Sequence, residues 1–337
     1  MIEKLQVAAT ASLLMFTATT GVFAETDQLK FAQDDGSFIS VKAPALYPEG
    51  LEYDPLREQF LLGSVRQGKV VSLDHEGSVK TLVDDDRLRQ VIGIRVDAER
   101  GRLLINNSDY GLGERSKPED KFGFISLAVY DLETGSPIQF VNLSNLRPGE
   151  AKFVNDLTID VEGNAYITDS LAAAIYKVTP SGSATVFLTN ERFRSEGFNL
   201  NGIQYHDDGY LLVAKKSDGA LFKIPLDDPQ RFTEVRLPKP LVGTDGLVLV
   251  SGNELVAITN LASGVESNTV FQLISNDGWE SAEIGETFET GNVYPTTGTV
   301  VDGKLFVNYG QLNTLGGAVN DGAEFESTFR IQEVGSK

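Results

Sequence analysis

The stretch Asn155-Asp-Leu-Thr-Ile-Asp160, with the turn Val-Glu-Gly-Asn164 and the apolar run Ala165-Tyr-Ile-Thr-Asp169 after it, is one of six similar segments in this chain. Each segment combines a short alternating strand, a tight turn and a second apolar strand, which is the pattern of a β-hairpin. The six segments begin with Glu49-Gly-Leu, Ile92-Gly-Ile, Asn155-Asp-Leu, Asn201-Gly-Ile, Asp245-Gly-Leu and Thr297-Gly-Thr.

The spacing of these segments indicates how the chain is organised. They start at residues 49, 92, 155, 201, 245 and 297, so successive starts lie 43, 63, 46, 44 and 52 residues apart. Four short strands with their turns need about this length, which is typical of one propeller blade. The sequence therefore predicts an all-β fold, a six-bladed β-propeller with a central metal site. We expect residues 329–334 and 38–42 to pair as neighbouring strands of the last blade and to close the ring.

The N-terminus predicts export of the protein. Residues 5–23 are mostly apolar or small and end in Val-Phe-Ala24, where signal peptidase requires small side chains. A transmembrane anchor is the alternative, but the stretch is rich in Thr and lacks a basic flank. We expect residues 1–24 to be a signal peptide and residues 25–337 to form one propeller domain. The expected location is the periplasm or the exterior of the cell, with no membrane contact after cleavage.

Composition limits the classes of partner. The formal net charge is −19, with 48 acidic and 29 basic residues, so nucleic acid is an improbable partner. The chain contains no cysteine, which excludes disulfides, thiolate metal sites and thiol nucleophiles. A monomer that acts on a small molecule is the expected form.

The first residues of the six segments should project into one ring around the propeller axis. Four of them are carboxylates or amides, namely Glu49, Asn155, Asn201 and Asp245. Two acids and two amides that converge on an axis require a cation between them. Calcium prefers carboxylate and amide oxygens, whereas zinc would favour His or Cys. We therefore predict that these four residues bind one divalent cation, and Ca²⁺ is the ion that their oxygen ligands suit best.

These residues also carry a family resemblance. Tyr47-Pro-Glu49-Gly, Phe153-Val-Asn155-Asp, Leu200-Asn201-Gly-Ile and Thr244-Asp245-Gly-Leu resemble the regucalcin/gluconolactonase family, which belongs with the calcium-dependent phosphotriesterases. The resemblance covers about residues 45–310. It implies a calcium-dependent hydrolase of lactones or related esters, with Glu49, Asn201 and Asp245 as metal ligands. It also implies that Asn155 contacts both metal and substrate.

The resemblance leaves the substrate and the reaction open. Gluconolactonase-like members carry an Arg two positions before the Asn, where this chain has Phe153, so a more apolar substrate than a sugar lactone is expected. The proposed catalytic residue is Asp245, as general base for a water or as direct nucleophile. A non-catalytic, calcium-stabilised binding propeller remains the alternative function, and a strictosidine-synthase-like or lyase activity is a third.

Loops that join second to third strands should lie on the face of the predicted site. The longest are residues 109–124, residues 260–268 and the segment from Gly310 onward. We expect the first of these loops to cover the mouth of the channel and to shape specificity. His75 and His206 are expected in turns on the opposite face, away from the metal.

Overall fold

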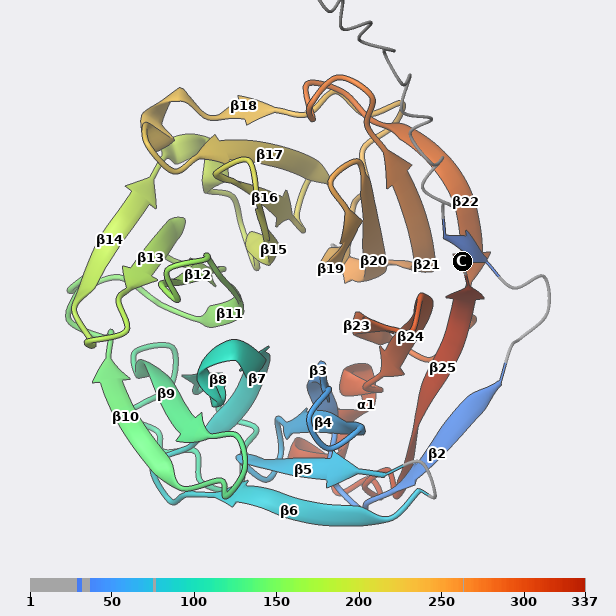
Figure 1. Cartoon of the computed structure of the whole chain (residues 1–337). Helices are drawn as coiled ribbons and strands as arrows, with labels where there is room; N and C mark the ends of the chain where they lie inside the picture. The colour runs from blue at the N-terminus through green and yellow to red at the C-terminus, as the bar shows by residue number, and fades with distance from the viewer. Residues whose placement is uncertain (1–28, 32–36, 75–76, 263, 337) are drawn as a thin grey trace, which may run out of the picture.

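The computed structural model describes residues 29–31, 37–74, 77–262 and 264–336. These residues form a six-bladed β-propeller, so the predicted fold is confirmed (Figure 1). The predicted signal peptide lies outside the described residues. Within the described part of the chain, no helix has the length and apolar character to cross a membrane.

Blades 1 to 5 are antiparallel sheets in which the strands follow one another from the channel outward. Their strands, from inner to outer, are β3 (Pro48–Asp54), β4 (Gln59–Ser64), β5 (Lys69–Leu73) and β6 (Val79–Asp84); β7 (Gln90–Asp97), β8 (Arg102–Ser108), β9 (Ile125–Asp131) and β10 (Pro137–Asn142); β11 (Val154–Ile159), β12 (Ala165–Asp169), β13 (Ala174–Val178) and β14 (Ala184–Thr189); β15 (Leu200–His206), β16 (Tyr210–Lys215), β17 (Ala220–Pro225) and β18 (Thr233–Glu234); and β19 (Thr244–Ser251), β20 (Glu254–Ala262), β21 (Val265–Ile274) and β22 (Glu283–Glu289).

Blade 6 joins the two ends of the chain. Its inner strands are β23 (Pro295–Val301), β24 (Lys304–Tyr309) and β25 (Thr328–Ser336), and both β1 (Lys30–Phe31) and β2 (Phe38–Lys42) pair with β25. Phe38 lies opposite Gln332 and Lys42 opposite Thr328, which confirms the predicted closure. The pairing ties the first described strands to the last one, so the ring has no open blade.

Helices are few and connect strands. The 3₁₀ turns are η1 (Ala98–Arg100), η2 (Glu191–Phe193) and η3 (Pro229–Arg231), and the α-helix is α1 (Leu312–Asn320). Helix α1 follows β24 and lies near the channel, beside β3 and β23 (Figure 1). Leu315 of α1 is fully buried against Leu46 and Phe329 of the neighbouring hydrophobic cluster. This contact fixes the helix at one mouth of the channel.

The hydrophobic core is divided among the blade interfaces. The described residues form six clusters of buried side chains, and each cluster combines residues from at least two neighbouring blades. One of them joins Ile175 and Leu188 of blade 3 to Ile203 and Phe222 of blade 4. Apolar burial therefore stabilises the ring between its blades, since each sheet has two faces to cover.

Every inner strand carries a bulge at the same place. The residue pairs flanking it are three apart on the inner strand and two apart on its neighbour, as for Leu200 opposite Lys215 and Ile203 opposite Val213. A bulge of this kind redirects a side chain and bends the strand. The bulged positions are residues 49–50, 92–93, 155–156, 201–202, 245–246 and 296–297.

The bulge corrects the predicted register of blade 6. The sequence pattern placed Thr297 in the ring, but Pro295 pairs with Tyr309 and Gly298 with Val307. Thr296 is therefore the counterpart of Glu49 and Asp245, and Thr297 takes the position that Gly holds in four other blades. Thr296 is fully buried, and its hydroxyl donates to Glu49 O at 2.7 Å. The Thr-Gly pair resembled the start of a segment, although the bulge falls one residue earlier.

At Gly50, the closeness of the next inner strand leaves no room for a side chain. A Cβ on Gly50 would lie 2.6 Å from Ile92 O and 2.9 Å from Ile94 N, both backbone atoms that cannot easily move. We predict that Gly50→Ala lowers the free energy of unfolding by about 1–3 kcal/mol. Thermal unfolding followed by circular dichroism measures the change.

The control for this prediction is Gly317→Ala in α1, where an added Cβ would meet no atom within 4 Å. We expect it to leave the melting temperature unchanged or to raise it, because Ala favours a helix over Gly. Equal melting temperatures for Gly50→Ala and the wild type would contradict close packing at the bulge.

Candidate functional site

The four residues predicted to bind a metal lie together at one end of the channel. Glu49, Asn155, Asn201 and Asp245 all line a cavity of about 320 Å³. Each is the second residue of its inner strand and the first residue of the bulge, which directs it toward the axis. Their exposed fractions are 9, 5, 2 and 6 %, so the polar floor of this cavity is almost removed from solvent.

Asp245 is the most heavily hydrogen-bonded side chain of the floor. Asn201 Nδ2 donates to its Oδ1, and Asn260 Nδ2 donates to its Oδ2. The Lys216 ammonium lies 3.0 Å from Oδ1. One carboxylate thus faces two amide donors and one cation, an arrangement that fixes its orientation.

The opposite half of the floor has free acceptors. Asn155 Nδ2 donates to Ser170 Oγ at 3.1 Å, and Asn155 Oδ1 is buried without a hydrogen-bond partner. Among the described residues, no hydrogen bond or ion pair reaches the Glu49 carboxylate. Burial and the nearby Asp245 and Asp156 raise the pKa of Glu49 well above its usual value, and Lys216 opposes this shift. A buried acceptor with no donor is costly, so this half of the floor is suited to a bound cation or a ligand donor.

The donor set fits a hard cation in its chemistry. The part of the chain that the structure describes has no group of three carboxylate, imidazole or thiol side chains suited to a metal ion. Calcium, however, also accepts amide oxygens, and Glu49 with Asn155 Oδ1 presents two unsatisfied oxygen ligands. On the side of Asp245, the position beside the carboxylate is held by the Lys216 ammonium.

The walls of the cavity are apolar and come from the predicted loops. The loop at 109–124 contributes Tyr110, Leu112 and Phe122, and α1 contributes Leu312 and Gly316. The prediction that these two segments lie over the site is therefore confirmed.

The prediction of a long loop at 260–268 is wrong, because β20 extends to Ala262 and β21 begins at Val265. Asn260 lies in a strand, and its side chain reaches the floor of the cavity through Asp245.

The loop at 109–124 has a defined structure. The Asp109 side chain is buried, and its carboxylate accepts from Gly111 N at 2.8 Å, Ser116 Oγ at 2.6 Å and Lys117 N at 2.9 Å. Arg66 also donates to Leu112 O at 3.0 Å. These bonds hold the loop against blade 1, so its apolar residues form a constant wall.

Phe153 gives the cavity an aromatic wall at the position where gluconolactonase-like proteins were expected to carry an Arg. Its ring lines the cavity and makes edge contacts with Tyr110 at 5.6 Å and Phe198 at 5.1 Å between ring centroids. Lys152 is absent from the lining, and its ammonium donates to Glu150 O at 2.7 Å. Position 153, where an Arg could have contacted a sugar, therefore has an aromatic ring.

Sequence reasoning missed Lys216 and Asn260, and it gave Tyr110 and Tyr294 no role. Burial raises the pKa of both tyrosines, and the nearby Glu49 raises it further, so they remain neutral hydroxyl donors. Lys216 directly follows a second strand, where a polar residue at the end of the blade could have been noticed. His206 is the last residue of β15 rather than part of the following turn, and it stacks on Tyr210 with centroids 4.2 Å apart and contacts Gly252 O. As predicted, it does not line the cavity. His75 lies outside the described residues.

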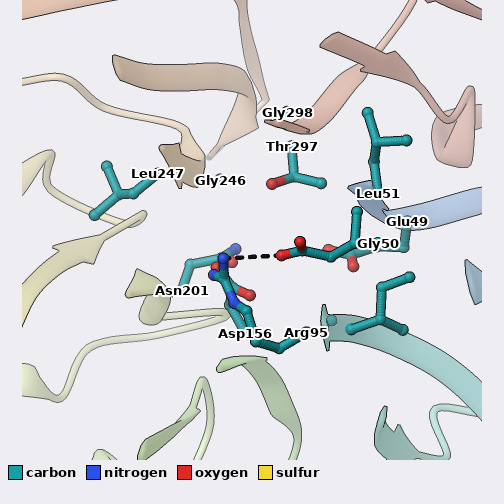
Figure 2. Close-up of a pocket in the computed structure, with 13 residues that line it drawn as sticks. Glu49, Gly50, Leu51, Arg95, Asp156, Asn201, Gly246, Leu247, Thr297 and Gly298 are labelled. Carbon is teal, nitrogen blue, oxygen red and sulfur yellow. Dashed lines mark ion pairs between the residues drawn. The ribbon is translucent and has the colours of Figure 1, made fainter. Parts of the chain in front are cut away.

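Beneath the floor, the channel is almost closed. Figure 2 shows Glu49, Arg95, Asp156 and Asn201 converging on the channel, and its dashed line marks the ion pair between Arg95 and Glu52, with an N–O distance of 2.8 Å. The space left among these side chains is about 10 Å³, room for roughly one water molecule. Side chains therefore nearly fill the channel beneath the floor of the cavity.

Comparisons with known proteins bear on the fold. No family model and no curated protein matches the sequence. The major allergen Mala s 1 of Malassezia sympodialis superposes with a TM-score of 0.69 at 20% identity, over 90% of this chain and 96% of the other. A gluconolactonase from Xanthomonas campestris superposes with a TM-score of 0.59 at 15% identity, over 92% and 96%. This chain shares the six-bladed fold of gluconolactonases.

The same fold occurs in a different enzyme class. Virginiamycin B lyase from Staphylococcus aureus superposes with a TM-score of 0.57 at 12% identity, over 91% of this chain and 99% of the lyase. The predicted resemblance to the gluconolactonase family thus holds for the architecture. At these identities the likeness establishes the fold, and the reaction has to be argued from the residues of the cavity.

Glu52 in the closed part of the channel generates a prediction about pH. Burial raises the pKa of Glu52 to about 7, against the lowering effect of Arg95. The unfolded chain has a lower pKa of about 4.3 at this residue. The folded protein therefore holds a proton that the unfolded chain releases, and this contribution to stability is lost as the pH rises from about 4.3 to about 7.

We predict that Glu52→Gln reduces the fall in the free energy of unfolding across this range, by on the order of 3–4 kcal/mol. Urea unfolding at a series of pH values measures it. The control is Glu99→Gln, which removes the same charge at a side chain that is 80% exposed. Parallel pH curves for Glu52→Gln and the wild type would show that folding does not raise the pKa of Glu52.

Proposed function

We propose that this protein is an exported, monomeric hydrolase of lactones or related esters that acts in the cavity beneath α1. The observation that carries the proposal is the contrast between the floor and the walls of the cavity. The floor combines Glu49, Asp245 and Lys216 with amide groups, and the walls are largely aromatic and aliphatic. Such a site would hold an apolar substrate with its polar bond toward the charged floor.

The floor supplies the groups that hydrolysis requires. Asp245 is the proposed general base for a water molecule, or the nucleophile, because its three donors hold one fixed orientation. Tyr110 and Tyr294 line the same cavity and stay protonated, so each can donate to an oxyanion that forms on the substrate. Asn155 is the proposed contact for the substrate, since its amide oxygen has no other partner.

A divalent cation completes the proposed site. Glu49, Asn155, Asn201 and Asp245 would hold Ca²⁺, which would supply Lewis-acid polarisation of the ester carbonyl. The likeness in fold to a gluconolactonase supports a lactone or ester as the substrate. The apolar wall around Phe153 favours an acyl or aryl group over a sugar.

The proposed function predicts an activity that depends on calcium. We expect the mature protein to hydrolyse members of a panel of aryl esters, γ- and δ-lactones and a phosphotriester. Activity should disappear in a chelator and return with Ca²⁺. Steady-state rates with each substrate, with and without chelator, provide the measurement.

Asp245→Asn tests the assigned residue in the same assay. We expect kcat to fall by at least about 10²-fold, because the amide can neither accept a proton nor attack. Unchanged rates would remove Asp245 from the mechanism. No hydrolysis by the wild type, together with a melting temperature that falls on chelation, would favour the calcium-stabilised binding propeller instead.

The lining of the cavity also predicts a limit on the size of the substrate. Gly316 of α1 lines the cavity, and an added Cβ there would meet no atom within 4 Å. Gly316→Leu should therefore narrow the cavity without strain in the fold. We expect kcat/KM for bulky aryl esters to fall about 10- to 100-fold relative to small ones.

The matched control is Gly317→Leu, at the next position of α1, where a Cβ is equally free of contacts and the residue is not part of the lining. It should leave the ratio of kcat/KM for large and small esters unchanged. Equal ratios in Gly316→Leu and the wild type would show that substrates bind elsewhere.

A further inference from the structure

Lys216 departs from a pattern that three other blades share. The pairs just before the bulge are Val91 with Asn107, Val154 with Asp169, Leu200 with Lys215 and Thr244 with Thr259. The next residues on the second strands are therefore structural equivalents, namely Ser108, Ser170, Lys216 and Asn260.

The equivalents of Lys216 connect neighbouring blades through short side chains. Ser108 Oγ donates to Val154 O at 2.9 Å, and Ser170 Oγ donates to Leu200 O at 2.6 Å. Asn260 Nδ2 donates to Pro295 O at 2.8 Å. Each bond reaches the backbone of the next inner strand, just before its bulge. At this position a short polar residue is sufficient for the fold.

The Lys216 side chain does something else. Its ammonium lies 3.0 Å from Asp245 Oδ1 and donates to Asn260 Oδ1. It also faces the Tyr294 ring, with 6.0 Å between Nζ and the ring centroid. The side chain is 10% exposed. Lys216 directly follows β16, and its ammonium group therefore lies in the floor of the cavity.

Two cations cannot share Asp245 at low cost. In a buried site, like charges a few ångströms apart repel strongly because little water screens them. An ion bound to Asp245 would have to displace the ammonium or tolerate it at close range. The Lys216 ammonium already occupies the place beside Asp245 Oδ1 that a bound cation would take.

We propose that Lys216 is a built-in cation of this cavity and competes with a divalent ion for Asp245. Calcium then binds only when the Lys216 ammonium leaves Asp245. The free energy needed to displace the ammonium lowers the affinity of the site for Ca²⁺. The folded protein keeps its floor intact without metal. The inference concerns the same cation site as the proposed function, and its test depends on binding alone, not on turnover.

Titration of chelator-treated protein with Ca²⁺, followed by calorimetry, tests the competition. We expect Lys216→Met, which keeps an unbranched side chain one atom shorter and removes its charge, to bind Ca²⁺ at least about tenfold more tightly than the wild type. The control Lys215→Met removes the same charge from the neighbouring residue, whose ammonium pairs with Asp218 at 3.0 Å. It should leave the affinity close to that of the wild type.

Thermal unfolding gives a second, independent readout. Without metal, Lys216→Met should melt below the wild type, because Asp245 loses its cation. Added Ca²⁺ should raise the melting temperature of this variant more than that of the wild type, since tighter binding stabilises the folded state more. Lys216→Gln, which can still donate a hydrogen bond, serves if the Met variant does not fold.

The outcomes separate this inference from the hydrolase proposal. Equal or weaker Ca²⁺ affinity in Lys216→Met and Lys216→Gln overturns the competition, and so does an absence of binding in both variants and the wild type. A gain in affinity supports the inference even if no ester in the panel is hydrolysed. Hydrolysis that depends on calcium, with no gain in affinity, supports the hydrolase and removes the role of Lys216.

Discussion

The close approach of six inner strands around one axis is the constraint on which the rest of this structure depends. Each inner strand is bulged at the same position, which leaves backbone carbonyls there without a partner in the ladder. Side chains from the preceding blade satisfy several of them: Asn106 donates to Asn155 O, Thr168 to Asn201 O and Asn308 to Glu49 O. The blades are thus joined by polar contacts at the axis and by apolar contacts farther out.

The same bulge creates the candidate site. It directs the first bulged residue toward the cavity, while a small second residue allows the next strand to approach. Asp156 stands where four other blades have Gly, and its carboxylate accepts from Leu157 N at 2.8 Å and Ile203 N at 3.3 Å. Burial raises the pKa of Asp156 to about 6. Asp156 thus adds a buried carboxyl group to the channel at a position that serves close packing in four other blades.

Much of this arrangement could be predicted from the sequence, because strand periodicity and repeat spacing follow directly from local chemistry. The blades, the closure through β2 and β25, and the gathering of Glu49, Asn155, Asn201 and Asp245 all depend on the repeat. Blade 6 was misplaced by one residue, because Thr297-Gly resembles the start of a segment and the bulge lies at Thr296. Lys216 was missed because its role depends on how far a long side chain reaches into the next blade, which no repeat reports.

The closure of the ring has a consequence for the order of assembly. Blade 6 combines the first described strands with the last one, and Thr296 of this blade holds the backbone of Glu49 in blade 1. During synthesis, β1 and β2 have no partner until residues 328–336 have emerged. The cavity is therefore complete only once the whole chain is available, and a chain truncated before β25 lacks the strand that pairs with both ends of the ring. Ligand binding at the floor of the cavity is therefore expected only after blade 6 has formed.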